Sequence, residues 1–144
     1  MSGPVEFKMS DNRLTPYAAL LLRLTLGLMM FAHGAIKVLV FTPAGTVRYF
    51  GSLGFPEAFA YFIIALELLG GIALILGVLT RWVALLFAAE LIGTIVVVHS
   101  SKGFLFTNAG GGWEFPAFAA ATAVALALLG DGPYALTRPS RAAG

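Results

Sequence analysis

The sequence predicts an all-α fold: an integral membrane four-helix transmembrane bundle with both termini in the cytoplasm. Hydrophobic residues make up 59% of the 144 residues, and charged residues make up only 11%, against about 25% in soluble domains. The apolar residues gather in four runs, each close to the ~20 residues that cross a bilayer as a helix. No run has the wide polar face of a helix on a soluble protein, so the runs are expected to lie in lipid.

Polar, glycine or proline residues separate the predicted elements. Residues 1–15 form a polar N-terminal tail, and Pro16 suits the first turn of the helix that follows. The transmembrane domain is expected over residues 16–130, and residues 131–144 form a polar C-terminal tail. The four predicted spans are 16–41, 55–79, 82–99 and 113–130.

Lysine and arginine residues predict the orientation, because basic residues are enriched on the cytoplasmic side. Five of them lie in the tails and in the turn between the second and third spans: Lys8, Arg13, Arg81, Arg138 and Arg141. The opposite side carries three: Lys37, Arg48 and Lys102. The loops 42–54 and 100–112 therefore face outward, and the chain is predicted to be a multi-pass protein of the inner (cytoplasmic) membrane.

The residue types present limit the chemistry. The chain has no cysteine, so disulfides and thiolate ligands are excluded. His33 and His99 are the two histidines, too few for a zinc site of three or four histidine nitrogens, and no metal site is predicted. The net charge of +2 does not indicate a nucleic-acid-binding protein. Membrane lipid is the expected surrounding partner.

Seven ionisable residues lie within the apolar runs or at their rims: Arg23, His33, Lys37, Glu67, Glu90, His99 and Glu114. A charge near the centre of a bilayer costs about 2.5–3.5 kcal/mol, so such residues usually face the bundle interior and pair. Counting 1.5 Å per residue along straight helices predicts two layers. The inner layer holds Arg23 with Glu67 and Glu90, as a structural ion pair that also serves to fix helix register.

The outer layer is predicted to hold His33, Lys37, His99 and Glu114, with Trp113 beside them. His33 and Lys37 are four residues apart and share a helix face. His99 is nine residues after Glu90, half a turn out of phase, so it joins this layer only if its helix ends or unwinds before it. The simpler interpretation is that Lys37 and His33 extend to the membrane interface and that Trp113 is an interface aromatic.

Short segments in a fixed order resemble those of the DoxX family of small four-helix bacterial membrane proteins. The resemblance covers about residues 20–136. Its first segments are Leu22-Arg23-Leu24 with Gly27, His33-Gly34 with Lys37, Leu53-Gly54-Phe55-Pro56, and Glu67-Leu68-Leu69-Gly70-Gly71. The later ones are Gly77 with Thr80-Arg81, His99 before Gly103-Phe104, Gly111-Gly112-Trp113-Glu114-Phe115-Pro116, and Gly130-Asp131-Gly132-Pro133-Tyr134. The resemblance implies a membrane subunit linked to quinone-dependent oxidation of sulfur or other small substrates, or to oxidative-stress protection.

The preferred hypothesis is a membrane subunit of a quinone-linked oxidoreductase assembly, with a polar pocket in the outer half of the bundle. His33 and Lys37 would donate hydrogen bonds to a quinone carbonyl, and Glu67 or Glu90 would relay protons. The quinone-binding set is His33, Lys37, His99, Trp113 and Glu114. A partner protein of the oxidoreductase complex or a homo-oligomer is expected, and whether this chain catalyses a reaction by itself is left open.

Three alternatives use the same residues differently. The chain could be a non-catalytic anchor that holds a soluble redox or stress-protection enzyme at the membrane. It could be a passage for a small molecule or ion, which would need several copies because four helices leave little room for water. Haem b between His33 and His99 is the weakest alternative, because the phase of His99 and the polar surroundings disfavour it.

Overall fold

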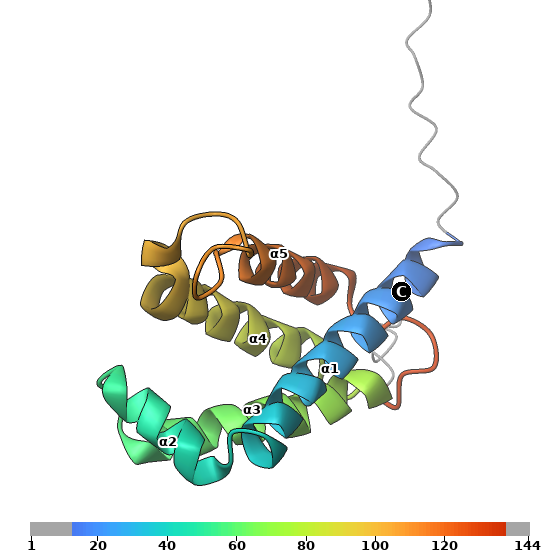
Figure 1. Ribbon diagram of the computed structural model, residues 1–144. Helices are drawn as coiled ribbons and strands as arrows, with labels where there is room; N and C mark the ends of the chain where they lie inside the picture. Colours follow the sequence, from blue (N-terminus) through green and yellow to red (C-terminus); the bar gives the residue numbers. More distant parts are fainter. Residues whose placement is uncertain (1–12, 138–144) are drawn as a thin grey trace, which may run out of the picture.

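The computed structural model describes residues 13–137, which form helices and connecting turns without a β-strand (Figure 1). The helices are α1 Thr15–Leu39, α2 Pro43–Ser52, α3 Glu57–Leu76, α4 Thr80–Thr94 and α5 Glu114–Leu129. Beyond α4 the chain continues as a π-helical turn, η1 Ile95–His99, and a 3₁₀ turn, η2 Ser100–Lys102. The all-helical prediction is therefore confirmed for the described residues.

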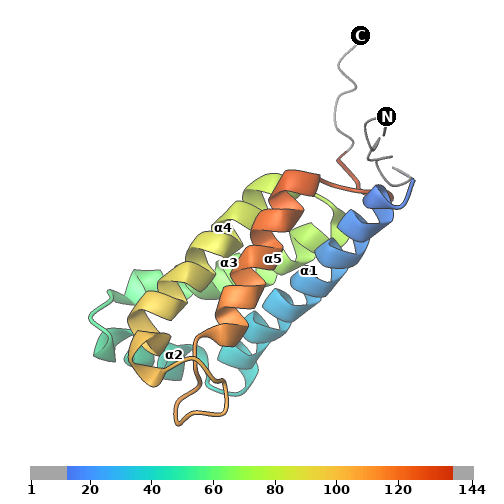
Figure 2. The same ribbon diagram turned by 90° about the horizontal axis from the view of Figure 1, so that it is seen from above.

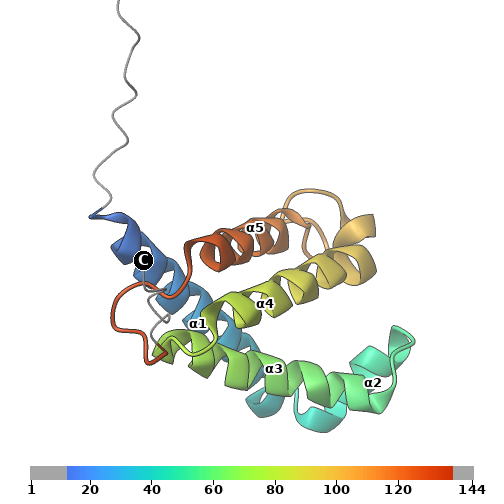
Figure 3. The same ribbon diagram turned by 180° about the vertical axis from the view of Figure 1, so that it is seen from behind.

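The long helices form two pairs. Helix α1 packs along α3, α4 packs along α5, and a smaller contact between α1 and α5 joins the pairs. Helices α3 and α4 meet at their connecting turn and separate away from it (Figure 3). Both ends of the described chain lie at one end of the bundle (Figure 2), called here the terminal end. The opposite end, formed by α2 and residues 103–113, is called the loop end.

Small residues bring α1 and α3 together. A Cβ atom on Gly27 would lie 2.9 Å from the carbonyl oxygen of Gly71, and one on Gly34 would lie 3.0 Å from the Cβ of Glu67. Such close approach is typical of membrane helix pairs, where van der Waals packing replaces the hydrophobic effect. Gly70, by contrast, faces Phe87 of α4. The glycines beside Glu67 therefore bring both neighbouring helices close to it.

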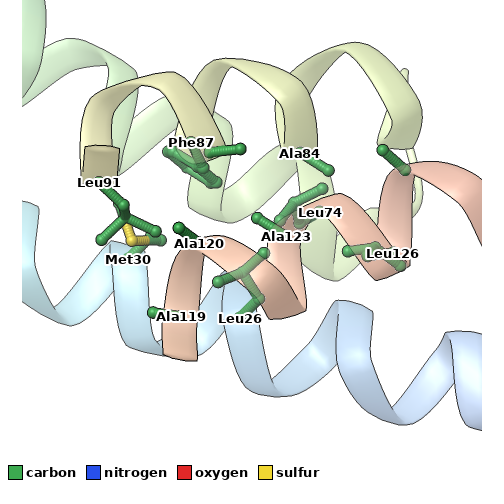
Figure 4. Close-up of a cluster of buried hydrophobic side chains, with 12 residues drawn as sticks. Leu26, Met30, Leu74, Ala84, Phe87, Leu91, Ala119, Ala120, Ala123 and Leu126 are labelled. Carbon is green, nitrogen blue, oxygen red and sulfur yellow. The ribbon is translucent and has the colours of Figure 1, made fainter. Parts of the chain in front are cut away.

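The apolar core lies between α1, α3, α4 and α5 (Figure 4). Leu26 and Met30 of α1 project onto a row of alanines on α5, and Phe87 of α4 closes the cluster. The small alanine side chains of α5 allow α4 and α5 to pack closely along their length.

Three of the helical segments are long and apolar enough to cross a membrane: Thr15–Leu39, Glu57–Leu76 and the continuous stretch Thr80–Lys102. Helix α5 is apolar but has only 16 residues, about 24 Å at 1.5 Å per residue, against a hydrocarbon core of about 30 Å. The structure thus supports a membrane bundle with three full-length spans and one shorter apolar helix.

The predicted outer loop 42–54 contains helix α2, which the apolar pattern did not reveal. The local signal was present, because Pro43 occupies the first turn and Thr42 caps it by accepting from the Gly45 amide at 3.2 Å. The single hydrogen of the buried Thr46 hydroxyl is shared between the Thr42 carbonyl oxygen at 3.0 Å and the Lys37 carbonyl oxygen at 3.1 Å. Helix α2 is thereby tied to the end of α1, next to a functional candidate.

Candidate functional site

A lysine and two glutamates meet inside the helical spans. The Lys37 ammonium lies 2.7 Å from Glu67 Oε1, and the Glu90 carboxyl is close enough to the Glu67 carboxyl to interact with it electrostatically. Only 3% of Glu67 is exposed. We call Lys37, Glu67 and Glu90 the lysine–glutamate cluster. It draws one residue from each of α1, α3 and α4, so it bridges the two helix pairs.

Helix packing positions each member. Glu67 lies midway along α3, ten residues after Glu57 and nine before Leu76. Lys37 is in the last turn of α1, where the Thr46 hydroxyl holds its carbonyl group. Glu90 projects from α4, and the Thr94 hydroxyl donates to the Glu90 carbonyl oxygen at 3.0 Å.

The cluster has more carboxylate oxygens than donors. The Lys37 ammonium donates a hydrogen bond to Glu67 Oε1. Glu67 Oε2 and Glu90 Oε2 are buried without a hydrogen-bond partner among the described residues. Buried polar atoms normally have partners. One ammonium balances one carboxylate, and a proton held between the two carboxyls would make the cluster neutral. The geometry is suited to holding and passing one proton, or to binding a polar ligand.

The predicted ion pair of Arg23 with Glu67 or Glu90 is wrong. Arg23 is 1% exposed, but its guanidinium donates to the main-chain oxygens of Asp131 at 2.6 Å and Pro133 at 3.3 Å. Lys37 is the cation beside Glu67 instead. Glu67 and Glu90 do meet, as the prediction required, so only the identity of the cation changes.

An offset between helices explains the error. A Cβ on Gly77, just past the end of α3, would collide with the Arg23 guanidinium, so Arg23 is level with that end. Helix α1 starts at Thr15, eight residues earlier, and so protrudes about 12 Å beyond α3. The predicted depths were counted as if all helices began at the same level. That assumption placed Lys37 too close to the loop end relative to Glu67. The predicted separation of Lys37 and Glu67 into two layers is therefore also wrong.

His33 is exposed on α1, one turn before Lys37. Its Nδ1 lies 2.8 Å from the Met29 carbonyl oxygen, which can only accept, so Nδ1 carries a hydrogen. In a neutral ring Nε2 is then an acceptor. Donation from His33 to a quinone carbonyl stays a prediction, and with Nδ1 held by Met29 it requires a ring that is protonated at Nε2 as well.

The remaining predicted binding residues, His99, Trp113 and Glu114, belong to the loop end. Helix α4 gives way to η1 before His99, which confirms the expected change of helix geometry. However, His99 Nδ1 pairs with the Gly111 carbonyl oxygen at 2.8 Å, and Glu114 Oε1 accepts from the Phe106 amide at 2.7 Å. The Trp113 ring packs edge-on against Phe104. These side chains hold the loop over residues 103–113, because each of these three partners lies within it.

An apolar groove of about 340 Å³ runs between α3 and α4. Its lining residues are Phe62, Ala65, Leu66, Leu69, Gly70, Ala73 and Val83. Leu66 and Gly70 are near Glu67 in the sequence, but consecutive residues of a helix point in different directions, and no residue of the lysine–glutamate cluster lines the groove. No motif predicted the groove, because it arises from the separation of α3 and α4 rather than from a sequence pattern.

The matched part of the chain contains the whole cluster. The DoxX family model matches residues 18–100, from early α1 through η1. The protein named "Putative oxidoreductase CatD" of Bacillus subtilis (strain 168) is 38% identical over 120 residues, which cover 83% of this chain and 84% of that protein. No solved structure matches the chain. With a matched family segment over more than half of its length and a relative this similar, the chain belongs to the DoxX family.

Proposed function

We propose that this chain is an integral membrane subunit of a quinone-linked oxidoreductase assembly, and that the lysine–glutamate cluster binds the head group of the quinone. One observation carries the proposal. A half-buried lysine, a buried glutamate and a half-buried glutamate meet within the predicted membrane spans, and two of their carboxylate oxygens are buried without a partner among the described residues. Ionisable groups at such depth are costly and usually functional. The name of the relative CatD supports the link to oxidoreductases.

The residues present fit the chemistry of a quinone. The Lys37 ammonium can donate to an oxygen of the ring, and the paired carboxyls of Glu67 and Glu90 can hold the proton that a change of its redox state requires. A bound quinone would supply the two-electron chemistry. The protein's part is to place donors at one polar edge of the ring and to exclude water from it.

The apolar groove suits the rest of the molecule. It lies between α3 and α4 and is lined by apolar side chains, of which Phe62 and Leu69 are themselves exposed at the surface. A ring or an isoprenoid tail entering from the lipid would meet this surface first. The groove is formed by α3 and α4, the helices that also carry Glu67 and Glu90.

The placement in the cell follows from the same proposal. The terminal end is assigned to the cytoplasm, since basic residues favour that side. The chain would be a multi-pass protein of the cytoplasmic membrane, with α5 as its shorter fourth span. A partner protein of the assembly, or a second copy of the chain, would complete the enzyme.

A binding titration tests the proposal. Purified protein in lipid nanodiscs is titrated with decylubiquinone and with a short-chain menaquinone analogue, using isothermal titration calorimetry. Glu90→Gln keeps the shape but removes the shared proton site, and we expect at least tenfold weaker binding. Glu57→Gln is the matched control, because Glu57 is an exposed glutamate at the start of α3. Its affinity should equal that of wild type.

Three results would contradict the proposed quinone site. Equal affinity in wild type and Glu90→Gln would remove the cluster from the site. No binding of either quinone would favour the anchor hypothesis, in which cluster substitutions leave recruitment of the partner enzyme unchanged. Proton flux into liposomes that disappears in Glu67→Gln would instead favour a passage.

A further inference from the structure

His33 is an exposed ionisable side chain of α1 that the lysine–glutamate cluster does not use. It lies ten residues after Arg23, about 15 Å further along α1. Its neighbour Gly34 packs on Glu67 and Leu68, and Glu67 is midway along α3. An exposed imidazole is shorter than a lysine side chain and extends less far towards water. A hydrogen-bonding ligand beside it would satisfy its second ring nitrogen.

The tautomer of His33 specifies what that partner must be. The Nδ1 hydrogen is used by the Met29 carbonyl oxygen at 2.8 Å. No described residue donates a hydrogen bond to Nε2. The lone pair of Nε2 in the neutral ring therefore calls for an O–H or N–H donor. A group that only accepts, such as a ketone, does not satisfy it.

The position of His33 connects it to the proposed quinone site. Lys37 is four residues later on the same helix face, and the buried Met30 is three residues earlier. His33 thus stands at the edge of the α1 face that carries the cluster. A flat ring held at Lys37 and the two glutamates would extend along α1 towards His33.

We infer that His33 makes this site select the reduced form, a hydroquinone, over the oxidised quinone. This inference rests on the proposed function. A quinone has only carbonyl acceptors, whereas a hydroquinone carries two O–H donors. Nε2 of His33 accepts from one hydroxyl, and Lys37 donates to the oxygen of the other. The inference concerns binding alone and requires no electron transfer by this chain.

An anaerobic titration compares decylubiquinol with decylubiquinone in nanodiscs. Wild type should bind the reduced form at least tenfold more tightly. His33→Phe should lose this preference while its affinity for the oxidised form stays within twofold of wild type. His33→Gln retains an acceptor and should retain part of the preference, which covers the case that the phenylalanine variant does not fold. Thr25→Val is the matched control, since Thr25 is another exposed polar residue of α1, and it should retain the full preference.

The outcomes separate this inference from the proposed function. Equal wild-type affinity for both forms overturns the role of His33, while weaker binding by Glu90→Gln would still uphold the cluster. Tighter binding of decylubiquinol than of decylubiquinone by His33→Phe would also overturn the role of His33. If wild type binds neither form, both proposals fall. A Soret band in the purified protein that disappears in His33→Phe would assign Nε2 to haem iron and overturn the inference.

Discussion

The cations at the two ends of the bundle have different kinds of hydrogen-bond partner. At the terminal end, the Arg23 guanidinium is held by the main-chain oxygens of Asp131 and Pro133. Towards the loop end, the Lys37 ammonium is held by a carboxylate that adjoins a second carboxyl. Main-chain carbonyls cannot take up a proton, whereas carboxyls can. The first arrangement is therefore structural, and the second has the capacity for chemistry.

The contrast extends to the backbone around each charge. The segment after α5 folds across the terminal end, where the amides of Leu136 and Thr137 donate to the carbonyl oxygens of Leu76 and Gly77. This closes the end of the bundle. At the other end, α3 and α4 separate. Buried polar atoms without a partner among the described residues occur at both ends: Arg23 Nε and Thr80 Oγ1 at the terminal end, and one carboxylate oxygen each of Glu67 and Glu90 in the cluster. The two ends therefore differ in the closing segment and in the pair of carboxyls, rather than in how completely their polar atoms are paired.

The largest effect is expected at Arg23. Arg23→Met removes the donor to two carbonyls at a buried site, and each unsatisfied carbonyl costs about 1–3 kcal/mol. We expect a loss of at least about 3 kcal/mol in unfolding free energy, measured by denaturant titration in mixed micelles. The exposed Arg48→Met serves as the control and should have no measurable effect. Wild-type stability in Arg23→Met would contradict the structural role of the terminal end.

Gly77→Ala should have the next largest effect. Gly77 has a φ of 72° and its added Cβ would collide with the Arg23 guanidinium and with Ala135. Both the left-handed backbone and the collision oppose alanine, so we expect a loss of about 2 kcal/mol by the same titration. Gly51→Ala is the control, because nothing lies within 4 Å of its added Cβ. Equal effects of the two substitutions would argue against tight packing at this end.

Lys37→Met tests the interaction between Lys37 and Glu67 towards the loop end. It leaves Glu67 and Glu90 without a cation, and neighbouring charged groups couple by about 0.5–3 kcal/mol. We expect a loss of about 1–2 kcal/mol for Lys37→Met, and a double variant with Glu67→Gln that is less destabilised than the sum of the single variants. Thermal unfolding of all four proteins measures this coupling. Strict additivity would show that the two side chains do not interact.

The smallest effect is expected for Thr46→Val. The substitution preserves side-chain shape and removes the hydroxyl that donates to the Lys37 carbonyl oxygen at 3.1 Å. Such a hydrogen bond contributes about 1 kcal/mol, and we expect a loss of that size. Quinone affinity should change by less than threefold, because the Lys37 side chain stays in place. A tenfold loss of affinity would instead make α2 part of the binding site.

Much of the fold followed from the sequence, because hydrophobic length and small residues act locally. The apolar runs predicted α1, α3 and α4 to within a few residues of their ends, and glycines beside Glu67 predicted its close neighbours. The resemblance to the DoxX family is confirmed by the family match over residues 18–100. Helix α2 was missed because it is short and only partly apolar, although Thr42-Pro43 is a recognisable helix start.

The composition of the site was harder to predict than its existence. The sequence indicated that buried acids and bases must meet, and Glu67 does meet Glu90. It did not indicate that Lys37 rather than Arg23 supplies the cation, or that the partners of His99 and Glu114 lie in the loop. Those choices depend on how far each helix is shifted along its axis relative to its neighbours. The sequence does not specify that shift.

The sequence by itself determined that this protein is helical, lies in a membrane and buries ionisable groups there, because hydrophobicity and charge are properties of each residue. The tertiary structure decided which groups meet. The two-turn offset of α1 against α3 moves Arg23 to main-chain carbonyls and brings Lys37 to Glu67. The physical reason is that a side chain reaches only a few ångströms, so a shift of about 12 Å along one helix replaces every polar partner.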